Sequence, residues 1–151
     1  MTDPFTGIEV TNSRVFPVSR TALFEAFAQR EALAAWWGPQ GFRNEVTAFD
    51  LRPGGAFGIT MISPNGAAFD NRKTFREVVP GERVVVEHHQ PVHHFLMTMT
   101  FEDVDPDEGA GQSRLTWHMR FTPASDQEDL DRFIHSANEQ NFDRLETFLD
   151  Q

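Results

Sequence analysis

The feature that most constrains the fold is an alternation of apolar residues with mostly polar ones in two segments, residues 94–102 and 113–122. The apolar positions are Phe95, Met97, Met99 and Phe101 in the first segment, and Leu115, Trp117, Met119 and Phe121 in the second. Successive side chains of a strand point to opposite faces of a sheet. A period of two with one apolar face therefore predicts an antiparallel sheet that is covered on one side.

A long amphipathic helix at the end of the chain is the expected cover. Ser125 and Glu128 have the spacing of a capping box, in which each side chain satisfies a free amide of the first turn. The helix is expected to run to about Leu149, over roughly 35 Å. Its inner stripe contains Leu130, Phe133, Ile134, Ala137, Asn141, Leu145 and Phe148. Asn141 interrupts this stripe as the polar member, which makes it a candidate ligand contact, the alternative being a bond to a strand side chain.

The remaining elements are expected before these segments. A first strand over residues 7–17 precedes two short helices; Ser19 caps the first, and the second spans residues 30–37. Further strands are expected over residues 42–51, 56–62, 67–79 and 82–89. The sequence thus predicts a single α+β domain over residues 1–151, in which a curved antiparallel sheet of about six to seven strands wraps around the long C-terminal helix.

Charge and composition argue against several classes of partner. The chain has 13 Lys and Arg against 23 Asp and Glu, a formal charge of −10, which disfavours nucleic acids and anionic membrane surfaces. It lacks cysteine, so disulfides and thiolate metal sites are impossible. No apolar run approaches the ~20 residues of a membrane span, and the N-terminus has neither the basic start nor the apolar stretch of a secretion signal. We therefore expect a cytoplasmic protein that does not insert into membranes.

Several short motifs carry a family resemblance. They are Trp36-Trp37-Gly38-Pro39, Arg52-Pro53-Gly54-Gly55, the run over residues 75–85, and Arg114-Leu115-Thr116-Trp117. With the order of elements, they resemble the START-like (SRPBCC) helix-grip superfamily, and within it the branch named for the activator of heat-shock-protein-90 ATPase homologues. The resemblance covers the chain from about residue 8 to its end. It implies a deep apolar cavity between sheet and long helix, in which members bind or transfer hydrophobic molecules and a few catalyse reactions.

Apolar residues of the sheet and of the second short helix are candidates for lining such a cavity. Methionine and aromatic side chains together form an adaptable apolar wall. We expect ligand contacts from Trp36, Trp37, Phe57, Phe75, Met97 and Trp117. At least one of the two adjacent tryptophans is expected to belong to the core. The alternative is a filled core without a cavity, which needs the same residues.

Five of the six histidines fall between residues 88 and 118. Alternation places His88 and His93 inward, near the turn at residues 90–92. There they are candidates for ligand contact, for acid–base chemistry near neutral pH, or for metal binding. The alternative is a hairpin tip whose histidines face water and have no function. We expect no metal site, because no cysteine or obvious carboxylate joins the two imidazoles.

The strand expected over residues 67–79 has polar residues on its apolar face. This face contains Phe69, Asn71, Lys73, Phe75 and Glu77. An inward Asn71 or Glu77 costs ~1–3 kcal/mol unless it is hydrogen-bonded, so we expect it either to pair with a nearby histidine or to contact a ligand. A single bulge would reverse the alternation and place Arg72 inward.

No known catalytic motif occurs in the chain, and no cofactor is expected. The sequence predicts binding of a small hydrophobic or amphipathic molecule, oriented by a few inward polar groups. One alternative is a cyclase, dehydratase or hydrolase with His88 or His93 as general base, which predicts a group with a shifted pKa beside the cavity. Another is a chaperone-associated interaction module, which predicts a filled core and an exposed apolar patch. A homodimer is compatible with all three.

Overall fold

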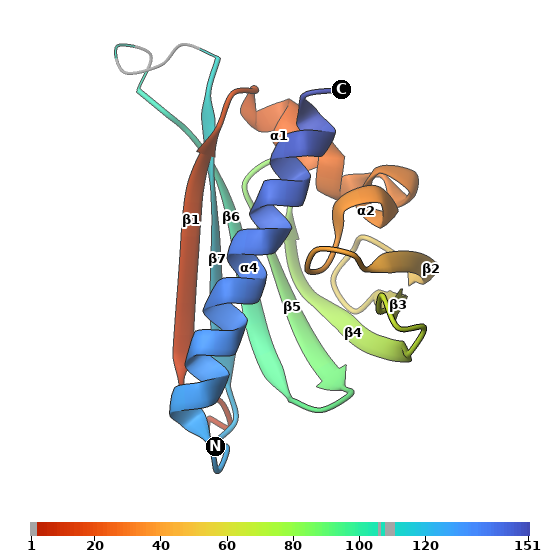
Figure 1. The fold of residues 1–151 in the computed structure, drawn as a ribbon. Coiled ribbons are helices and arrows are strands. Elements are labelled where there is room, and N and C mark those ends of the chain that lie inside the picture. The colour runs from red at the N-terminus through yellow and green to blue at the C-terminus, as the bar shows by residue number, and fades with distance from the viewer. Residues whose placement is uncertain (1–2, 106, 108–110) are drawn as a thin grey trace.

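The computed structural model describes residues 3–105, 107 and 111–151. Its elements are β1 (Glu9–Phe16), α1 (Arg20–Ala28), α2 (Arg30–Trp36), β2 (Arg43–Phe49), β3 (Ala56–Ile62), β4 (Ala68–Val79), β5 (Arg83–Gln90), β6 (Phe95–Asp103), β7 (Ser113–Phe121) and α4 (Gln127–Leu149). The strands form one antiparallel sheet in the order β1-β7-β6-β5-β4-β3-β2, and α4 packs across its concave face (Figure 1). The predicted helix-grip architecture is confirmed.

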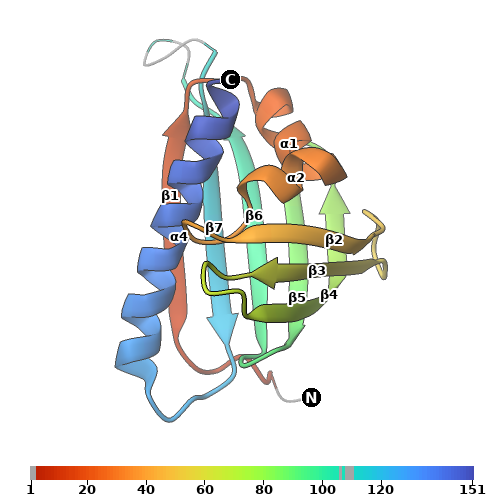
Figure 2. The same cartoon turned by 45° about the vertical axis from the view of Figure 1, so that its right-hand side comes forward.

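The sheet is strongly curved. In Figure 2, β2 and β3 run across the direction of β6 and β7, so that the two ends of the sheet approach α4 from different sides. The long strand β4 carries two irregularities in its pairing with β5, between Arg72 and Lys73 and between Phe75 and Glu77. A bulge adds a residue to one strand and bends it, which accounts for part of this curvature.

The two helix starts that the sequence predicts differ in outcome. Ser19 caps α1 as expected, because its hydroxyl accepts the amide of Ala22 at 3.1 Å. The predicted capping box at Ser125 is wrong. The helix begins one residue later, with Asp126 as a cap that makes no side-chain bond, because Ser125 and Asp126 form a turn after β7. Glu128 and Asp129 in the first turn still complement the helix dipole.

The core lies between the concave face of the sheet and the helices. The alternation of β6 and β7 is confirmed, since Met97, Met99, Leu115 and Trp117 are all buried on this face. Helices α1 and α2 close the core beyond the C-terminal half of α4 (Figure 2). Trp36 is 1% exposed and its indole N–H donates to the Ala26 carbonyl at 3.0 Å, which ties α2 to α1.

Candidate functional site

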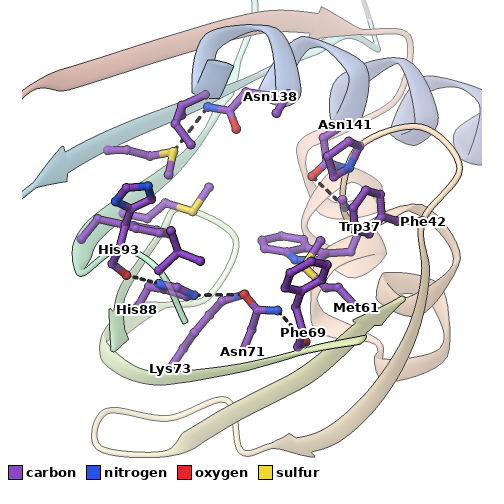
Figure 3. A pocket seen from close by; sticks show the side chains of 18 of the residues that line it. Trp37, Phe42, Met61, Phe69, Asn71, Lys73, His88, His93, Asn138 and Asn141 are labelled. Carbon is purple, nitrogen blue, oxygen red and sulfur yellow. Dashed lines mark hydrogen bonds between the residues drawn. The ribbon is translucent and has the colours of Figure 1, made fainter. Parts of the chain in front are cut away.

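Between the sheet and α4 the core is incomplete, and a cavity of about 270 Å³ remains. Strands β4 to β7 form its floor and one wall, the middle of α4 forms the opposite wall, and the loop after α2 closes one end (Figure 3). This volume lies just below the ~300–1,000 Å³ of sites for drug-sized ligands. The cavity therefore suits a small molecule.

The mouth of the cavity is apolar. Three large hydrophobic side chains are exposed among the described residues, namely Phe69 (39%), Val92 (81%) and Phe133 (67%). All three line this cavity. Phe133, expected within the buried stripe of the last helix, instead lies at the opening. Exposed apolar groups that gather around one concave site are typical of ligand entry.

Lys73 on β4 is the most unusual residue of the cavity wall. It is 7% exposed, and its side-chain amine forms no ion pair or hydrogen bond within the part of the chain that the structure describes. Its Nζ atom lies 4.5 Å from the ring centre of Trp37 and 4.3 Å from that of Phe57. These ring faces attract a cation, but burial lowers the pKa of Lys73 to about 7. Near neutral pH a far larger fraction of this amine is therefore uncharged than in an ordinary lysine.

His88 is the cross-strand partner of Lys73. Its Nδ1 lies 2.8 Å from the His93 carbonyl and its Nε2 lies 3.0 Å from Oδ1 of Asn71 (Figure 3). Burial, and after it the charge of Lys73, lower the pKa of His88 to about 4. The neutral ring has one N–H and can donate to only one of these two oxygens. The predicted pairing of Asn71 with a histidine is confirmed.

Asn141 does not bond a strand side chain, which was the alternative to a ligand contact; it bonds backbone groups at the end of α2 and in the loop after it, and its contact with a ligand stays a prediction. Its Oδ1 accepts the amide of Gly38 at 3.0 Å, and its Nδ2 donates to the Trp36 carbonyl at 2.7 Å. Arg144, one turn further along α4, donates to the carbonyls of Trp37, Gly38 and Pro39 at 2.7–3.0 Å. These bonds fix the loop after α2 to the long helix. Asn141 lines the cavity and also holds Trp37 in place on its wall.

The structure brings six of the ten predicted site residues to the cavity. They are Trp37, His88, His93, Met97, Trp117 and Asn141. Trp36 and Phe75 are buried in the core and do not line the cavity, and Phe57 contributes to it only as the ring beneath Lys73.

The predicted inward position of Glu77 is wrong. The bulge after Phe75 reverses the alternation of β4, and Glu77 forms an ion pair with Arg83 in which both side chains are nearly half exposed. The alternative of an inward Arg72 is also wrong, since Arg72 is exposed and pairs with Asp70.

Sequence reasoning missed the importance of Lys73. It recognised Lys73 as one of several polar residues on the apolar face of its strand but did not choose it as a site residue. The missed signal is that Lys73 is the only lysine in the chain. Asn138 was missed as well; it lines the cavity and donates to Oδ1 of Asn12 at 3.0 Å and to the Met119 sulfur at 3.3 Å.

A second polar cluster lies on the outer face of the sheet. In this cluster, the side-chain nitrogen and oxygen atoms of Glu87, His89 and His94 that could bind a metal ion all lie within 4.8 Å of one another. Glu87 also receives bonds from Arg76 at 2.7 Å and from His94 at 2.6 Å, and His89 bonds the hydroxyl of Thr74 at 2.8 Å. Burial opposes the charge on Glu87, but the bonds from His94 and Arg76 outweigh it and lower the pKa of this carboxyl. The cluster is thus a bonded network of compensated charges.

Within the described residues, no helix is both long and apolar enough to cross a membrane. Comparison with known proteins gives one family and many related structures. The sequence profile described as "Activator of Hsp90 ATPase homolog 1-like protein" matches residues 17–150. No curated protein matches the chain.

Solved structures with the same fold include a protein from Nitrosomonas europaea, with 20% identity, a TM-score of 0.80, and coverage of 99% of this chain and 97% of that one. A protein from Arthrobacter aurescens has 13% identity and a TM-score of 0.83, with 99% and 90% covered. The AHSA1 protein from Silicibacter pomeroyi has 18% identity and a TM-score of 0.76, with 95% and 98% covered. At these identities the likeness concerns the fold.

Proposed function

Because the chain belongs to the Activator of Hsp90 ATPase homolog 1-like family, whose profile covers residues 17–150, we propose that its helix-grip fold serves to bind a small, mainly hydrophobic molecule between sheet and α4. The observation that carries this proposal is the cavity of about 270 Å³ whose mouth gathers the exposed large apolar side chains of the described chain. Burial of apolar ligand surface would supply most of the affinity, at roughly 25 cal/mol per Å².

The polar groups of the cavity favour a ligand with an acceptor at one end. Among the described residues, the amine of Lys73 has no hydrogen-bond or ion-pair partner. Trp117 also lines the cavity, and the same residues offer its buried indole N–H no acceptor. Both groups are donors, and a buried donor without an acceptor costs about 1–3 kcal/mol. A carbonyl or carboxylate oxygen on the ligand would satisfy such a donor.

The distribution of apolar surface supports ligand binding over a chaperone-associated interaction module. Such a module predicts a filled core and an apolar patch on the outer surface. Here Phe69, Val92 and Phe133 all belong to the mouth of the cavity. Entry of a ligand is enough to explain why these three side chains are exposed, and no protein partner is needed.

Binding of 3-phenylpropan-1-ol, followed by tryptophan fluorescence, tests the proposal, because Trp37 and Trp117 line the cavity. We expect saturable quenching. Ala137 on α4 also lines the cavity, so Ala137→Phe should fill part of it and weaken binding by about tenfold, which corresponds to ~1.4 kcal/mol. The neighbouring Ser136 is exposed and off the cavity wall, so Ser136→Phe should leave the affinity unchanged. Equal affinities of the two variants, or no quenching at all, would contradict the proposal.

A further inference from the structure

The chain contains one side-chain amine, and it lies in the cavity. Of its 13 basic residues, Lys73 is the only lysine, and the others are arginine. A guanidinium stays protonated in proteins and is not a nucleophile, whereas a lysine loses its proton readily when buried. If the cavity needed only a positive charge or a cation over aromatic rings, arginine would serve equally well, and the rest of this chain uses arginine throughout.

The surroundings of Lys73 favour an uncharged, reactive amine. Burying an ammonium without a carboxylate is costly, and the described residues around Lys73 offer two ring faces and the neutral imidazole of His88. Burial accordingly lowers the pKa of Lys73 to about 7. A lysine that is desolvated in an apolar pocket is activated as a nucleophile toward carbonyl carbon.

We propose that Lys73 captures a small hydrophobic aldehyde or ketone in the cavity as a reversible imine. This inference rests on the proposed function, because the carbonyl compound must first enter as a ligand. The nitrogen lone pair attacks the carbonyl carbon, a C–N bond forms, and one amine proton moves to the oxygen to give a carbinolamine. The oxygen then leaves as water with the second amine proton, and a C=N bond remains. Addition of water reverses both steps, so no oxidant or reductant is consumed.

The cavity also selects among carbonyl compounds. Its volume of about 270 Å³ limits the size of the molecule, and the apolar mouth formed by Phe69, Val92 and Phe133 disfavours hydrophilic compounds such as sugars. The class that fits is a compact apolar body with one aldehyde or ketone group. Its carbonyl end would lie toward β4 and its apolar body toward Met97, Trp117 and α4.

Reductive trapping in the full chain tests this inference. The protein is incubated at pH 7 with 3-phenylpropanal and cyanoborohydride, which reduces an imine to a stable secondary amine, and the modified peptide is identified by mass spectrometry. The α-amino group of the chain is the only other primary amine and serves as an internal reference. Its usual pKa of about 7.7–8.0 lies far closer to neutral pH than that of an ordinary lysine, so it also reacts under these conditions.

We expect Lys73 to be modified about tenfold faster than the α-amino group by 3-phenylpropanal, and more slowly than it by glyceraldehyde, which the apolar mouth excludes. Lys73→Met should remove all side-chain modification, leaving only the α-amino product. Modification confined to the α-amino group, while 3-phenylpropan-1-ol still quenches the tryptophans, would overturn the imine and leave the proposed ligand binding intact. If neither 3-phenylpropanal nor 3-phenylpropan-1-ol binds, both the imine and the proposed ligand binding are overturned.

Discussion

The two faces of strands β4 and β5 hold charge in opposite ways. On the outer face, Glu87 is bonded by both Arg76 and His94 at 2.7 and 2.6 Å. On the inner face, Lys73 lies against two aromatic rings and meets no carboxylate among the described residues. Because side chains alternate along a strand, these contrasting environments lie only a few residues apart.

The contrast between the paired Glu87 and the unpaired Lys73 marks the inner face as the place where the fold does not maximise its stability. On the outer face, the carboxylate of Glu87 has two bonding partners, Arg76 and His94. A carboxylate beside Lys73 on the inner face would in the same way have stabilised its ammonium. The unpartnered amine instead coincides with the unfilled part of the core. Local departures from good packing and charge pairing concentrate at functional sites, and here three such departures meet: an empty volume, an unpaired amine and an apolar opening.

Across the cavity from this inner face, α4 carries Asn141, a buried amide that is hydrogen-bonded at both its oxygen and its nitrogen, and removing it should have the largest effect. Asn141→Leu would leave the Gly38 amide and the Trp36 carbonyl without partners in a buried setting. At ~1–3 kcal/mol for each of the two groups, we expect the free energy of unfolding to fall by about 2–6 kcal/mol, as measured by urea denaturation. The adjacent Gln140 accepts one exposed amide, and Gln140→Leu should cost no more than about 0.5 kcal/mol. Similar losses in the two variants would mean that Asn141 does not fix the loop.

Lys73→Met should have the opposite effect and raise the free energy of unfolding. The pKa of Lys73 is lowered, so below about pH 7 the folded chain bears the full cost of a buried ammonium; this cost fades as pH rises from 7 towards 10.5, where the unfolded chain also loses the proton. After allowing for the lost ring contacts, we expect the variant to be more stable than the parent by about 2–3 kcal/mol at pH 6. The difference between the two should disappear by about pH 10.

Arg72→Met provides the matched control, since Arg72 precedes Lys73 on the same strand but is exposed. It should change stability by about 0.5 kcal/mol or less at either pH. If Lys73→Met is no more stable than the parent at pH 6, then Lys73 is well solvated or paired, and the contrast between the two faces fails.

Much of the architecture could be predicted because it depends on short-range patterns. Alternation in β6 and β7 fixed which side chains face the core, and the long stripe of α4 required a sheet to cover. The pairing of Asn71 with a histidine followed from the same alternation, together with the cost of an unbonded inward amide. These inferences need no knowledge of the distance between elements.

The remaining features depend on geometry that a pattern does not contain. Glu77 lies outside because a bulge adds one residue after Phe75, and nothing in the local sequence locates that bulge. Asn141 bonds a loop about 100 positions away in the sequence, so its partner could not be inferred from helix periodicity. Whether the core is filled depends on the sum of many side-chain volumes, and only the structure shows the gap beside Lys73.

The outer network gives the smallest expected effect and completes the comparison. Glu87→Gln removes a carboxylate whose side chain is 18% exposed and which is bonded by Arg76 and His94. We expect a loss of about 1 kcal/mol at pH 7, measured by urea denaturation. The pKa of Glu87 is lower in the folded chain than in the unfolded chain. Its contribution to stability is therefore present above the unfolded-state pKa and is lost as pH falls through the folded-state pKa, so parent and variant should converge in acid.

Glu77→Gln is the control, because Glu77 pairs with Arg83 and both side chains are nearly half exposed; it should cost less at every pH. If Glu87→Gln and Lys73→Met shifted stability in the same direction at pH 6, the two faces would not differ in charge compensation, and the unpaired amine would lose its significance as a sign of function.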